Sequence, residues 1–568
     1  MKKIAMLTVK GAIGLLPLTI KNKLKSNHKL TEFYSKSLQR SGLFYGFPSK
    51  KKLMAMYGKY QQQQEHTLNT LASGYAAPDA LQVIIVGNGG VEVTLGALSR
   101  QGLSSLKVIV VGESGPRTGV QQASRLSGAI DRLDKGAPVL LLNAGDTLHQ
   151  HALKLLFQAL STDPLVYCDT DMRDKQGKLS APHFLPDWNP ELLYSTAYID
   201  TGVLVTVVAL AQVRNTDVQT ISGVVAELAL LRPAISIGHV PYTLVHRSTQ
   251  TTHIKAGLND VAKVLANYTP AALAYNEALQ VNHVQWPVAE NPLVSLIIPT
   301  KNAKDLVKAC IESIQNKTSY KNYEILLIDN GSDEPQSLAY FDTLKQVENI
   351  RVLSYPGPFN YSAINNFGVA HANGDIVGLV NNDIEVIKPD WLTFMVGHAV
   401  RDDVGCVGAK LLYSDGRVQH AGVVMGYGGG AGHAHKYFPR YHPGYMKRLI
   451  ATQNYSAVTA ACLLVKKSLF NAVGGLNEKD LTVAFNDVDF CLRVQETGVR
   501  NVYCAEAELY HHESVSRGLD IAPEKAARFQ RELTYLQTTW ADVIAHDPAY
   551  SPNLTLKREN FSIKGEGE

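Results

Sequence analysis

The sequence predicts an α/β protein with two tandem domains, each built on a mainly parallel sheet flanked by helices. Three observations support this fold class. At 568 residues the chain is too long for a single hydrophobic core. A strand–helix–strand unit follows residue 293, and such a unit places its two strands parallel. The same outline recurs in weakened form in the first half of the chain.

The second half contains the clearer copy of this pattern. Apolar runs bounded by polar residues or proline predict buried strands, and the segments between them predict helices. The predicted strands are Val294–Pro299, Tyr323–Asp329, Ile350–Leu353 and Asp375–Val380, and the predicted helices are Lys304–Gln315 and a segment near Ser362–Ala372. The last strand ends abruptly in Asn381, Asn382 and Asp383. Ligands of α/β sheets bind at such strand ends, so this point is the first candidate for a site.

The first half repeats the outline with different chemistry. Its predicted strands are Leu81–Val86, Leu106–Val111 and Pro138–Leu142, and the third leads to Asp146 as the later strand leads to Asp383. Because equivalent points keep their order, duplication is favoured over chance similarity. Gly112 stands where the second copy has Asp329, and no acid–His pair follows the triplet Asp169-Thr170-Asp171. The first copy is therefore predicted to be a scaffold that lacks the full set of catalytic residues.

The composition describes a soluble globular protein, with 45% hydrophobic residues and a mean hydropathy of -0.07. The six cysteines form no Cys-x-x-Cys pair, which argues against a zinc site or a disulfide framework and fits a reducing cytoplasm. The predicted organisation is a basic segment (1–78), a degenerate first domain (79–250), a linker (251–290), a catalytic domain (291–525) and a C-terminal helix and tail (526–568).

The amino terminus is strongly basic. Residues 1–60 hold 13 Lys or Arg against the single acid Glu32, whereas the whole chain has a net charge of only +4. The apolar stretch Ile4–Ile20 is interrupted by Lys10, bent by Pro17 and too short to span a bilayer. It favours an interfacial helix on the inner face of the plasma membrane, and a disordered or core-packed leader is the alternative. No nucleic-acid partner is expected.

Two carboxylates follow predicted strands of the second half. Asp329 can accept hydrogen bonds from a nucleobase or a ribose hydroxyl, and a plain Asx-turn is the alternative. Asp383 suits a hard divalent cation beside a phosphate, and helix capping is the alternative. Glu385 is a secondary candidate, because it reaches the same side only if the strand continues.

Two further elements lie later in the chain. In a helix, Asp487 and Asp489 do not share a face, so one can act as a general base while Asp489 pairs with Arg493. A helix start enriched in acids for dipole reasons is the alternative. His511 and His512 follow a strand-like segment, and either one could complete a metal shell or bind a diphosphate. For the histidines, a solvated loop is the alternative.

Taken in order, these motifs resemble the family 2 glycosyltransferases, which have a GT-A fold. The matching stretches are Val294–Thr300, Ile328–Ser332, Leu379–Asp383, Ala460–Leu464, Gly474–Glu478 and Asn486–Arg493. Further stretches resemble a bacterial subgroup that assembles surface polysaccharide, such as O-antigen or capsule: Gln453–Ala461, Tyr510–Gly518 and Asp547–Leu556. In that subgroup a degenerate GT-A-like domain commonly precedes the active one, and His183–Leu193 is similar to it.

The resemblance implies roles for individual residues. Asp487 would be the catalytic base, and Asp383 with His511 or His512 would hold Mn²⁺ or Mg²⁺. The donor would meet Pro299, Thr300, Asn302, Asp329, Asn330, Ser332, Asn366, Asn381 and Asn382, and the acceptor would meet Asn486 and Trp391. Two residues depart from the family pattern. Asn381 replaces the first Asp of the Asp-x-Asp motif, and Asn486 replaces the Glu of the Glu-Asp motif.

The resemblance thus implies a metal-dependent, inverting glycosyltransferase of the hexosyltransferase type. It would move a sugar from a nucleotide-sugar donor to a growing polysaccharide, expected to be lipid-linked, in the cytoplasm or at the inner membrane surface. One alternative is a non-catalytic pseudo-transferase that binds glycan or organises a synthesis complex. A sugar-phosphate nucleotidyltransferase is disfavoured, because Thr300–Ala303 is not a Gly-rich loop with Arg and Lys.

Overall fold

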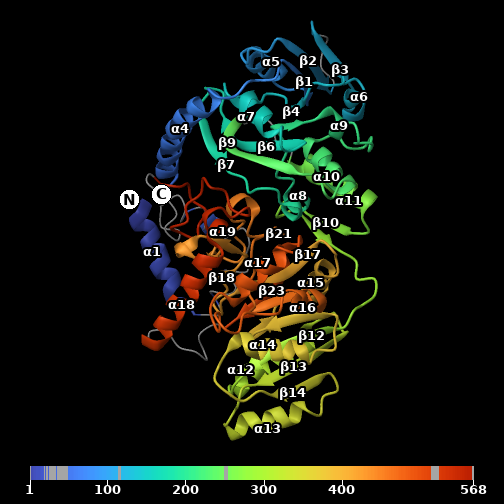
Figure 1. Cartoon of the computed structure of the whole chain (residues 1–568). Helices are drawn as coiled ribbons and strands as arrows, with labels where there is room; N and C mark the ends of the chain where they lie inside the picture. The colour runs from blue at the N-terminus through green and yellow to red at the C-terminus, as the bar shows by residue number, and fades with distance from the viewer. Residues whose placement is uncertain are drawn as a thin grey trace. The chain divides into compact units, whose positions relative to one another are not determined.

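In the computed structural model of the protein, residues 2–17, 20, 24, 33–34, 37, 49–112, 117–248, 254–512, 523–565 and 568 are described. The chain forms two compact units (Figure 1). The N-terminal unit comprises Pro48–Val284, Ala549–Thr555 and Ser562–Glu568, and the C-terminal unit comprises Met1–Phe47, Gln285–Pro548 and Leu556–Phe561. Each unit has its own large sheet.

The sheet of the C-terminal unit has the strand order β14-β13-β12-β15-β22-β17-β23-β16. Its strands are β12 (Val294–Thr300), β13 (Tyr323–Asp329), β14 (Ile350–Ser354), β15 (Ile376–Val380), β16 (Ile384–Val386), β17 (Val404–Leu412), β22 (Cys462–Lys466) and β23 (Arg500–His511). The first four strands of this order run parallel, and β22 is antiparallel to both of its neighbours. The mainly parallel α/β fold and the four predicted strands are therefore confirmed.

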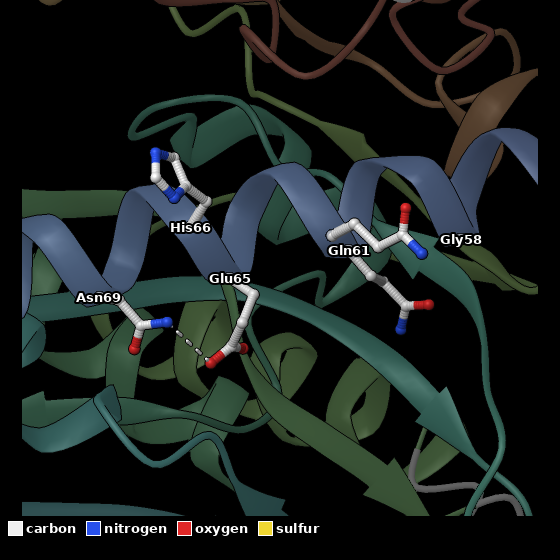
Figure 2. A pocket seen from close by; sticks show the side chains of 6 residues that line it. Gly58, Gln61, Glu65, His66 and Asn69 are labelled. Atoms are coloured by element: carbon white, nitrogen blue, oxygen red, sulfur yellow. Dashed lines mark hydrogen bonds between the residues drawn. The ribbon is translucent and has the colours of Figure 1, made fainter.

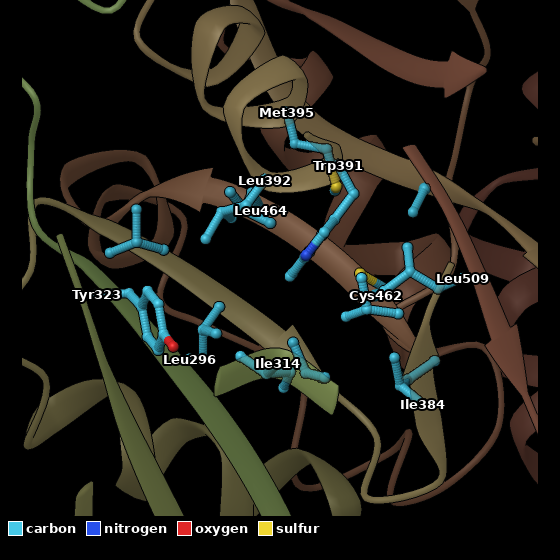
Figure 3. Close-up of a cluster of buried hydrophobic side chains, with 14 of the residues drawn as sticks. Leu296, Ile314, Tyr323, Ile384, Trp391, Leu392, Met395, Cys462, Leu464 and Leu509 are labelled. Atoms are coloured by element: carbon cyan, nitrogen blue, oxygen red, sulfur yellow. The ribbon is translucent and has the colours of Figure 1, made fainter. Parts of the chain in front are cut away.

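Helices and a large apolar core hold this sheet in place. The helices are α12 (Lys304–Lys317), α13 (Pro335–Leu344), α14 (Tyr361–Ala370), α15 (Trp391–Ala399), α16 (Lys467–Ala472), α17 (Asn486–Gln495), α18 (Pro523–Thr539) and α19 (Ala541–Ala545). Helix α12 buries Val307, Cys310, Ile311 and Ile314, whose spacing is that of one helical face. These residues pack with strand residues such as Leu296 and Leu464 (Figure 3). Burying each large apolar side chain stabilises the fold by about 1.5–3 kcal/mol. The core therefore holds the ends of the strands in fixed positions.

The sheet of the N-terminal unit repeats this plan. Its order is β3-β2-β1-β4-β8-β6-β9-β5, which matches the C-terminal sheet strand for strand. The strands are β1 (Ala80–Val86), β2 (Ser105–Val111), β3 (Val120–Ala123), β4 (Val139–Asn143), β5 (Thr147–Leu148), β6 (Leu165–Arg173), β8 (Val203–Val205) and β9 (Ile237–Ser248), with β7 (Leu179–His183) paired to β6. The three strands predicted here are confirmed, and the repeated topology agrees with duplication.

Two segments differ from the expected organisation. Residues expected to form a linker instead form α11 (Ile254–Tyr268) and the hairpin β10–β11 (Ala272–Asn276, Val281–Gln285). Helix α11 buries Leu258, Val261, Val264 and Leu265, so an apolar face keeps it on the N-terminal unit. Part of the expected basic segment forms α4 (Lys50–Ala72), which also belongs to that unit and buries Tyr57 and Leu68.

The extreme amino terminus is described only in part. Helix α1 (Lys2–Leu15) is present, and Leu7 and Val9 on it are 51% and 43% exposed. Most of the lysines that follow, and Glu32, lie outside the described residues. Within the described part of the chain, no helix combines the length and the apolar character that a membrane crossing requires.

Candidate active site

The carboxyl ends of β12 and β13 place Thr300 beside Asp329. The two residues are register partners, and the Asn330 N–H donates to the Thr300 carbonyl at 2.8 Å. One oxygen of Asp329, Oδ1, accepts the backbone N–H of Ser332 at 2.9 Å and its hydroxyl at 2.6 Å. The Asx-turn expected as an alternative is therefore present. Among the described residues nothing hydrogen-bonds the other oxygen, Oδ2, so this atom can meet a ligand.

The loop after β12 joins the same edge through Asn302. Its N–H donates to Ser332 Oγ at 2.7 Å, and its side-chain Oδ1 accepts the N–H groups of Asp333 and Glu334 at 3.0 and 3.1 Å. Asn302 and Ala303 have φ values of 56° and 58°, a left-handed conformation that costs energy in residues other than glycine. Such strain is typical of ligand-binding loops. Pro299, at the end of β12, is partly exposed beside this loop.

The end of β15 is tied to the end of β12. Asn382 Nδ2 donates to Thr300 Oγ1 at 3.0 Å. Asn381 Oδ1 accepts the hydroxyl of Tyr361 at 3.1 Å. Asp383 follows directly and is 7% exposed. The polar run that ends β15 thus lies against the edge that carries Asp329.

Strand β23 brings a histidine to Asp383. Strands β16 and β23 pair so that Ile384 lies opposite His511. In this register His511 Nε2 lies 3.1 Å from Asp383 Oδ1 and 3.1 Å from Asn381 Nδ2. Asp383 and His511 therefore form a pair of candidate metal ligands.

The side chain of the adjacent histidine, His512, contacts Glu385 and Ser414 instead. His512 Nε2 lies 3.2 Å from Glu385 Oε2, and its Nδ1 lies 2.7 Å from Ser414 Oγ. Neighbouring residues of a strand face opposite sides, so His511 and His512 cannot serve one ion equally. The expectation that His512 binds the metal is corrected here, and so is the secondary role of Glu385, which pairs with His512 and with Lys317 at 3.1 Å.

Asp487 lies in the first turn of α17. Its Oδ2 accepts the N–H of Ala460 at 3.0 Å, and its Oδ1 accepts the N–H of Val488 at 2.9 Å. Burial raises the pKa of this carboxyl above its ordinary value, and hydrogen bonds from Ala460, Thr459 and Val488 oppose that shift. A carboxylate with a raised pKa suits a general base. Asp489 instead pairs with Arg493 at 2.8 Å, as predicted.

Tyr361 links the base to the metal candidates. Its hydroxyl lies 3.1 Å from Asn381 Oδ1 and 3.0 Å from the Ala460 carbonyl. The N–H of Asn381 also donates to the Ala461 carbonyl at 3.0 Å. The turn that holds Asp487 is therefore hydrogen-bonded to the residue two positions before Asp383. The segments that carry Asp329, Asp383 and Asp487 are therefore joined by hydrogen bonds at the carboxyl edge of the sheet.

Several residues expected at the site face inward instead. Trp391 is fully buried, and its indole N–H donates to Thr318 Oγ1 at 3.0 Å, so its expected contact with an acceptor is wrong. Asn486 is 2% exposed and donates to the Val483 carbonyl at 3.0 Å. Asn330 is 3% exposed and donates to the carbonyls of Tyr355 and Gly357. These side chains support the site and do not line it.

Asn366 also has a structural partner. Its Nδ2 donates to the Leu476 carbonyl at 2.9 Å, and its Oδ1 accepts the Leu476 N–H at 2.9 Å. The Asn366 side chain therefore holds the loop around Gly475, whose Cβ position it fills, so Gly475 can carry no side chain. This arrangement does not support the expected contact between Asn366 and the donor.

Three residues that shape the site carried no sequence signal of their own. Tyr361 bridges Asn381 and Ala460, as described above. Gln419 contacts His511, with Oε1 2.8 Å from Nδ1. Glu532 of α18 accepts the Thr482 hydroxyl at 2.8 Å and the N–H groups of Val483 and Ala484 at 3.0 Å each, in the segment before Asp487. Only tertiary contacts reveal these roles.

The donor set at Asp383 fits a divalent cation. Asn381 donates to His511 Nε2, so this nitrogen and the Asp383 oxygen face each other at 3.1 Å as two acceptors. Two ligands bound at right angles to Mg²⁺ lie roughly 3.0 Å apart, which is close to this separation. Among the described residues, no group of three or more His, Cys, Asp or Glu side chains could hold a metal. Waters and diphosphate oxygens would therefore complete the shell.

The N-terminal unit keeps some of these positions and loses others. Asp146 precedes β5, and Thr147 lies opposite His246, just as Ile384 lies opposite His511. The resemblance ends there, because Asp146 accepts the Thr201 hydroxyl and the Ser248 N–H, and His246 contacts Asp171. Burial raises the pKa of Asp146 to about 6.

The other two acids have no counterpart in that unit. Gly112 occupies the position of Asp329, and a Cβ there would overlap the side-chain oxygen of Asn88. Helix α10 (Ile221–Leu231) follows β8 as α17 follows β22, and its first turn holds no acid. The first copy therefore lacks the equivalents of Asp329 and Asp487.

A hollow of about 680 Å³ lies against α4 of the N-terminal unit. Its lining residues all belong to one face of that helix, and they include Gln61, Glu65 and Asn69 (Figure 2). It contains none of the predicted site residues. A hollow bounded by a single helix offers no converging polar groups, so it is not a candidate active site.

Comparison with known proteins gives one family match. The glycosyl transferase family 2 matches residues 295–474 of this chain. A protein of Sinorhizobium fredii, named uncharacterized protein y4gI, is 42% identical over 479 residues, covering 78% of this chain and 51% of that protein. The O-antigen biosynthesis protein RfbC of Myxococcus xanthus is 34% identical over 462 residues, covering 76% of this chain and 35% of that protein. The chain thus spans about half or less of the length of these curated relatives.

Solved structures are similar at a lower level. One of them is the mannosyltransferase PcManGT from Pyrobaculum calidifontis, in complex with GDP-Man and Mn²⁺. The TM-score is 0.34 and the sequence identity 16%, over 47% of this chain and 70% of that chain.

Proposed function

We propose that the chain, whose residues 295–474 match glycosyl transferase family 2, moves a sugar from a nucleotide-sugar donor to a growing cell-surface polysaccharide, with inversion at the anomeric carbon. The observation that carries this proposal is the set of hydrogen bonds that joins the segments carrying Asp329, Asp383 and Asp487. A binding module would need the first of these acids, whereas a transferase needs all three.

The donor end of the site is the edge formed by β12 and β13. The free oxygen of Asp329 accepts a hydrogen bond from the nucleoside, and the Asn302–Ser332 contact keeps that carboxylate oriented. The diphosphate then reaches towards Asn382 and Asp383 at the end of β15. In this proposal the anomeric carbon faces Asp487, whose segment is hydrogen-bonded to Asn381 through Tyr361.

Asp487 acts as the general base of the transfer. Its carboxylate takes the proton of an acceptor hydroxyl, and the hydroxyl oxygen forms a bond to the anomeric carbon. The bond between that carbon and the diphosphate oxygen breaks, and the nucleoside diphosphate leaves with the electron pair. Attack from the face opposite the leaving group inverts the configuration.

A divalent cation fits at Asp383 and His511. Mn²⁺ or Mg²⁺ bound there would offset the negative charge of the diphosphate as it leaves. The residues of this chain that would hold it are Asp383 and His511, whose Oδ1 and Nε2 atoms lie 3.1 Å apart. The Asn381 amide, which lies 3.1 Å from the same Nε2, would have to turn away from that nitrogen.

The acceptor belongs to surface polysaccharide assembly, in line with the relative named for O-antigen biosynthesis. We take it to be lipid-linked. Exposed Leu7 and Val9 on α1, together with the excess of Lys and Arg in residues 1–60, suit an anionic membrane surface on the cytoplasmic side. The N-terminal unit serves as a non-catalytic scaffold or glycan-binding partner, because it lacks the equivalents of Asp329 and Asp487.

The decisive experiment is a donor screen. The purified chain is incubated with Mn²⁺ and a panel of nucleotide sugars, and slow hydrolysis of the donor is measured. The active donor is then tested with Asp383→Ala and with Asp402→Ala, an exposed control in the same unit. A transferase loses turnover with the first change and keeps it with the second. Binding of nucleotide sugar without turnover by the unaltered chain would instead establish the pseudo-transferase.

A further inference from the structure

A second hollow of the N-terminal unit, the α4–β9 hollow, has a volume of about 360 Å³. Three separate segments of that unit line it: one face of α4, Tyr242 of β9, and a later segment that includes Asn553, Lys564 and Glu568. The α4 residues differ from those that border the larger hollow, and they are Tyr60, Gln63, Gln64 and Thr67. Polar groups from distant parts of the chain therefore converge here, which they do not in the larger hollow.

Two amide side chains hold these segments together. Gln64 is 8% exposed, and its Oε1 accepts the Thr243 N–H at 2.8 Å while its Nε2 donates to the Thr243 carbonyl at 3.2 Å. Asn553 Nδ2 donates to Asp169 Oδ2 and to the Pro241 carbonyl, at 2.9 Å each. Helix α4 and the segment of Asn553 are thus both tied to β9 or its neighbourhood. The hollow is therefore preformed, and a ligand need not order it.

Several polar groups of the lining keep hydrogen-bonding capacity. Within the described part of the chain, the hydroxyl of Tyr242, the amide of Gln63 and the ammonium group of Lys564 make no hydrogen bond. Asn553 uses both amide hydrogens, and its Oδ1 has no donor among the same residues. The hollow therefore offers a ligand donors and acceptors together.

This lining suits a saccharide. An apolar ligand would remove water from these groups without replacing their hydrogen bonds, which is costly. A phosphate favours an excess of positive charge, whereas Glu568 accompanies Lys564 here. Sugar hydroxyls both donate and accept, and the rings of Tyr60 and Tyr242 add apolar surface beside their hydroxyls. The volume also lies within the range of about 300–1,000 Å³ that is usual for ligand pockets.

We propose that the α4–β9 hollow binds a short saccharide segment of the polysaccharide that the chain elongates. This inference rests on the proposed function, which supplies the polysaccharide. It gives the N-terminal unit a task that needs no equivalent of Asp329 or Asp487, because the hollow holds glycan and performs no chemistry.

The first test measures glycan binding directly and without any donor. The full chain is applied to an array of O-antigen and capsule oligosaccharides of defined structure, and calorimetry gives the affinity for the glycan bound most strongly. Gln63→Trp places an indole ring in the hollow. Gln62→Trp is the matched control, because Gln62 is also exposed on α4 but borders the larger hollow. Excluding a ligand that makes several hydrogen bonds should weaken binding roughly tenfold or more in Gln63→Trp, and Gln62→Trp should bind as the parent does.

The second test changes a single hydroxyl group. Tyr242→Phe keeps the ring, and the loss of one hydrogen bond should weaken glycan binding about 2- to 10-fold. Tyr275→Phe, at a partly exposed position of β10 in the same unit, should bind as the parent does. Thermal unfolding checks that each variant is folded. Donor hydrolysis should stay at the parent rate in all four variants, because none of these residues belongs to the active site.

The outcomes separate this inference from the proposed function. If the parent binds no glycan while it hydrolyses donor, the inference is overturned and the proposed function stands. Parent-like affinity in Gln63→Trp or Tyr242→Phe, or an equal loss in Gln62→Trp, would also overturn the inference. Glycan binding with the expected losses, in a parent chain that turns over no donor, would support the hollow as a saccharide site and overturn the transfer reaction.

Discussion

At the scale of single residues, the pKa of Asp487 governs how activity depends on pH. Burial raises this pKa, and the base works only when ionised, so activity is present above the raised pKa and is lost as pH falls through it. In a profile of kcat/KM against pH, the acid limb should therefore lie above the pKa of an ordinary Asp, about 3.9.

Asp487→Asn tests the assignment of that limb. Removing a general base should lower kcat by about 10²–10⁴-fold, and the acid limb should disappear from the residual rate. Donor binding and thermal unfolding serve as controls. An acid limb that persists in Asp487→Asn would assign the titration to another group.

The neighbouring histidines provide a matched pair of changes. His511 lies beside Asp383, whereas His512 pairs with Glu385 and Ser414. His511→Gln should weaken Mn²⁺ binding roughly tenfold or more, and His512→Gln should leave it near the parent value. Titration of both variants with Mn²⁺ in the absence of donor measures this. Equal losses in the two variants would contradict the placement of the metal.

At the scale of elements, α18 holds the entry to α17. Glu532 is 2% exposed and accepts three hydrogen bonds from Thr482, Val483 and Ala484. That segment ends in Phe485, whose φ of 59° is strained and which precedes the helix that carries the base. The carboxylate of Glu532 therefore holds the strained backbone segment that leads into α17.

Glu532→Ala removes the acceptor for these three donors. Leaving buried donors unpaired should lower the free energy of unfolding by about 1–3 kcal/mol, and kcat should fall with little change in the donor KM. Urea unfolding and steady-state kinetics measure the two effects. Glu524→Ala, at an exposed position of the same helix, is the control. A parent-like kcat in Glu532→Ala would show that α18 does not position the base.

How far these elements follow from the sequence depends on their chemistry. Buried strands are apolar runs, and polar residues end them, so the strands that lead to Asp329 and Asp383 could be found by pattern alone. The roles of His511 and Gln419 could not, because they depend on strand register and on a bulge between segments that are distant in sequence. Trp391 follows the Asp383 motif closely, yet helix packing turns it into the core.

The segment before β12 was predicted to be a linker, but it folds into α11 and the β10–β11 hairpin. The apolar residues of α11 recur at Leu258, Val261 and Leu265, which is the period of an amphipathic helix. That signal was present in residues expected to form a linker. Burial in the N-terminal unit, rather than the local pattern alone, makes this segment part of a domain.

At the scale of the whole molecule, the two large sheets share one strand order, but their equivalent aspartates make different contacts. Asp146 is closed in by Thr201 and Ser248, whereas Asp383 faces His511. Asp146→Asn should therefore leave transfer close to the parent rate, and Asp383→Asn should abolish it. The same donor assay compares them, with thermal unfolding as the control. Equal losses from both changes, with folding intact, would make the N-terminal unit a second catalytic site.

The overlap between Gly112 and Asn88 bears on evolutionary history. Duplicated domains are often imagined as able to regain a lost activity by simple reversion. Here an aspartate reinstated at position 112 would meet the Asn88 side chain, and the φ of 136° at that position is one that residues with a Cβ rarely adopt. The exposed Asn88 side chain can turn away, but the backbone conformation at position 112 would stay strained, so a single reversion is disfavoured and the first copy is left free to specialise in another direction.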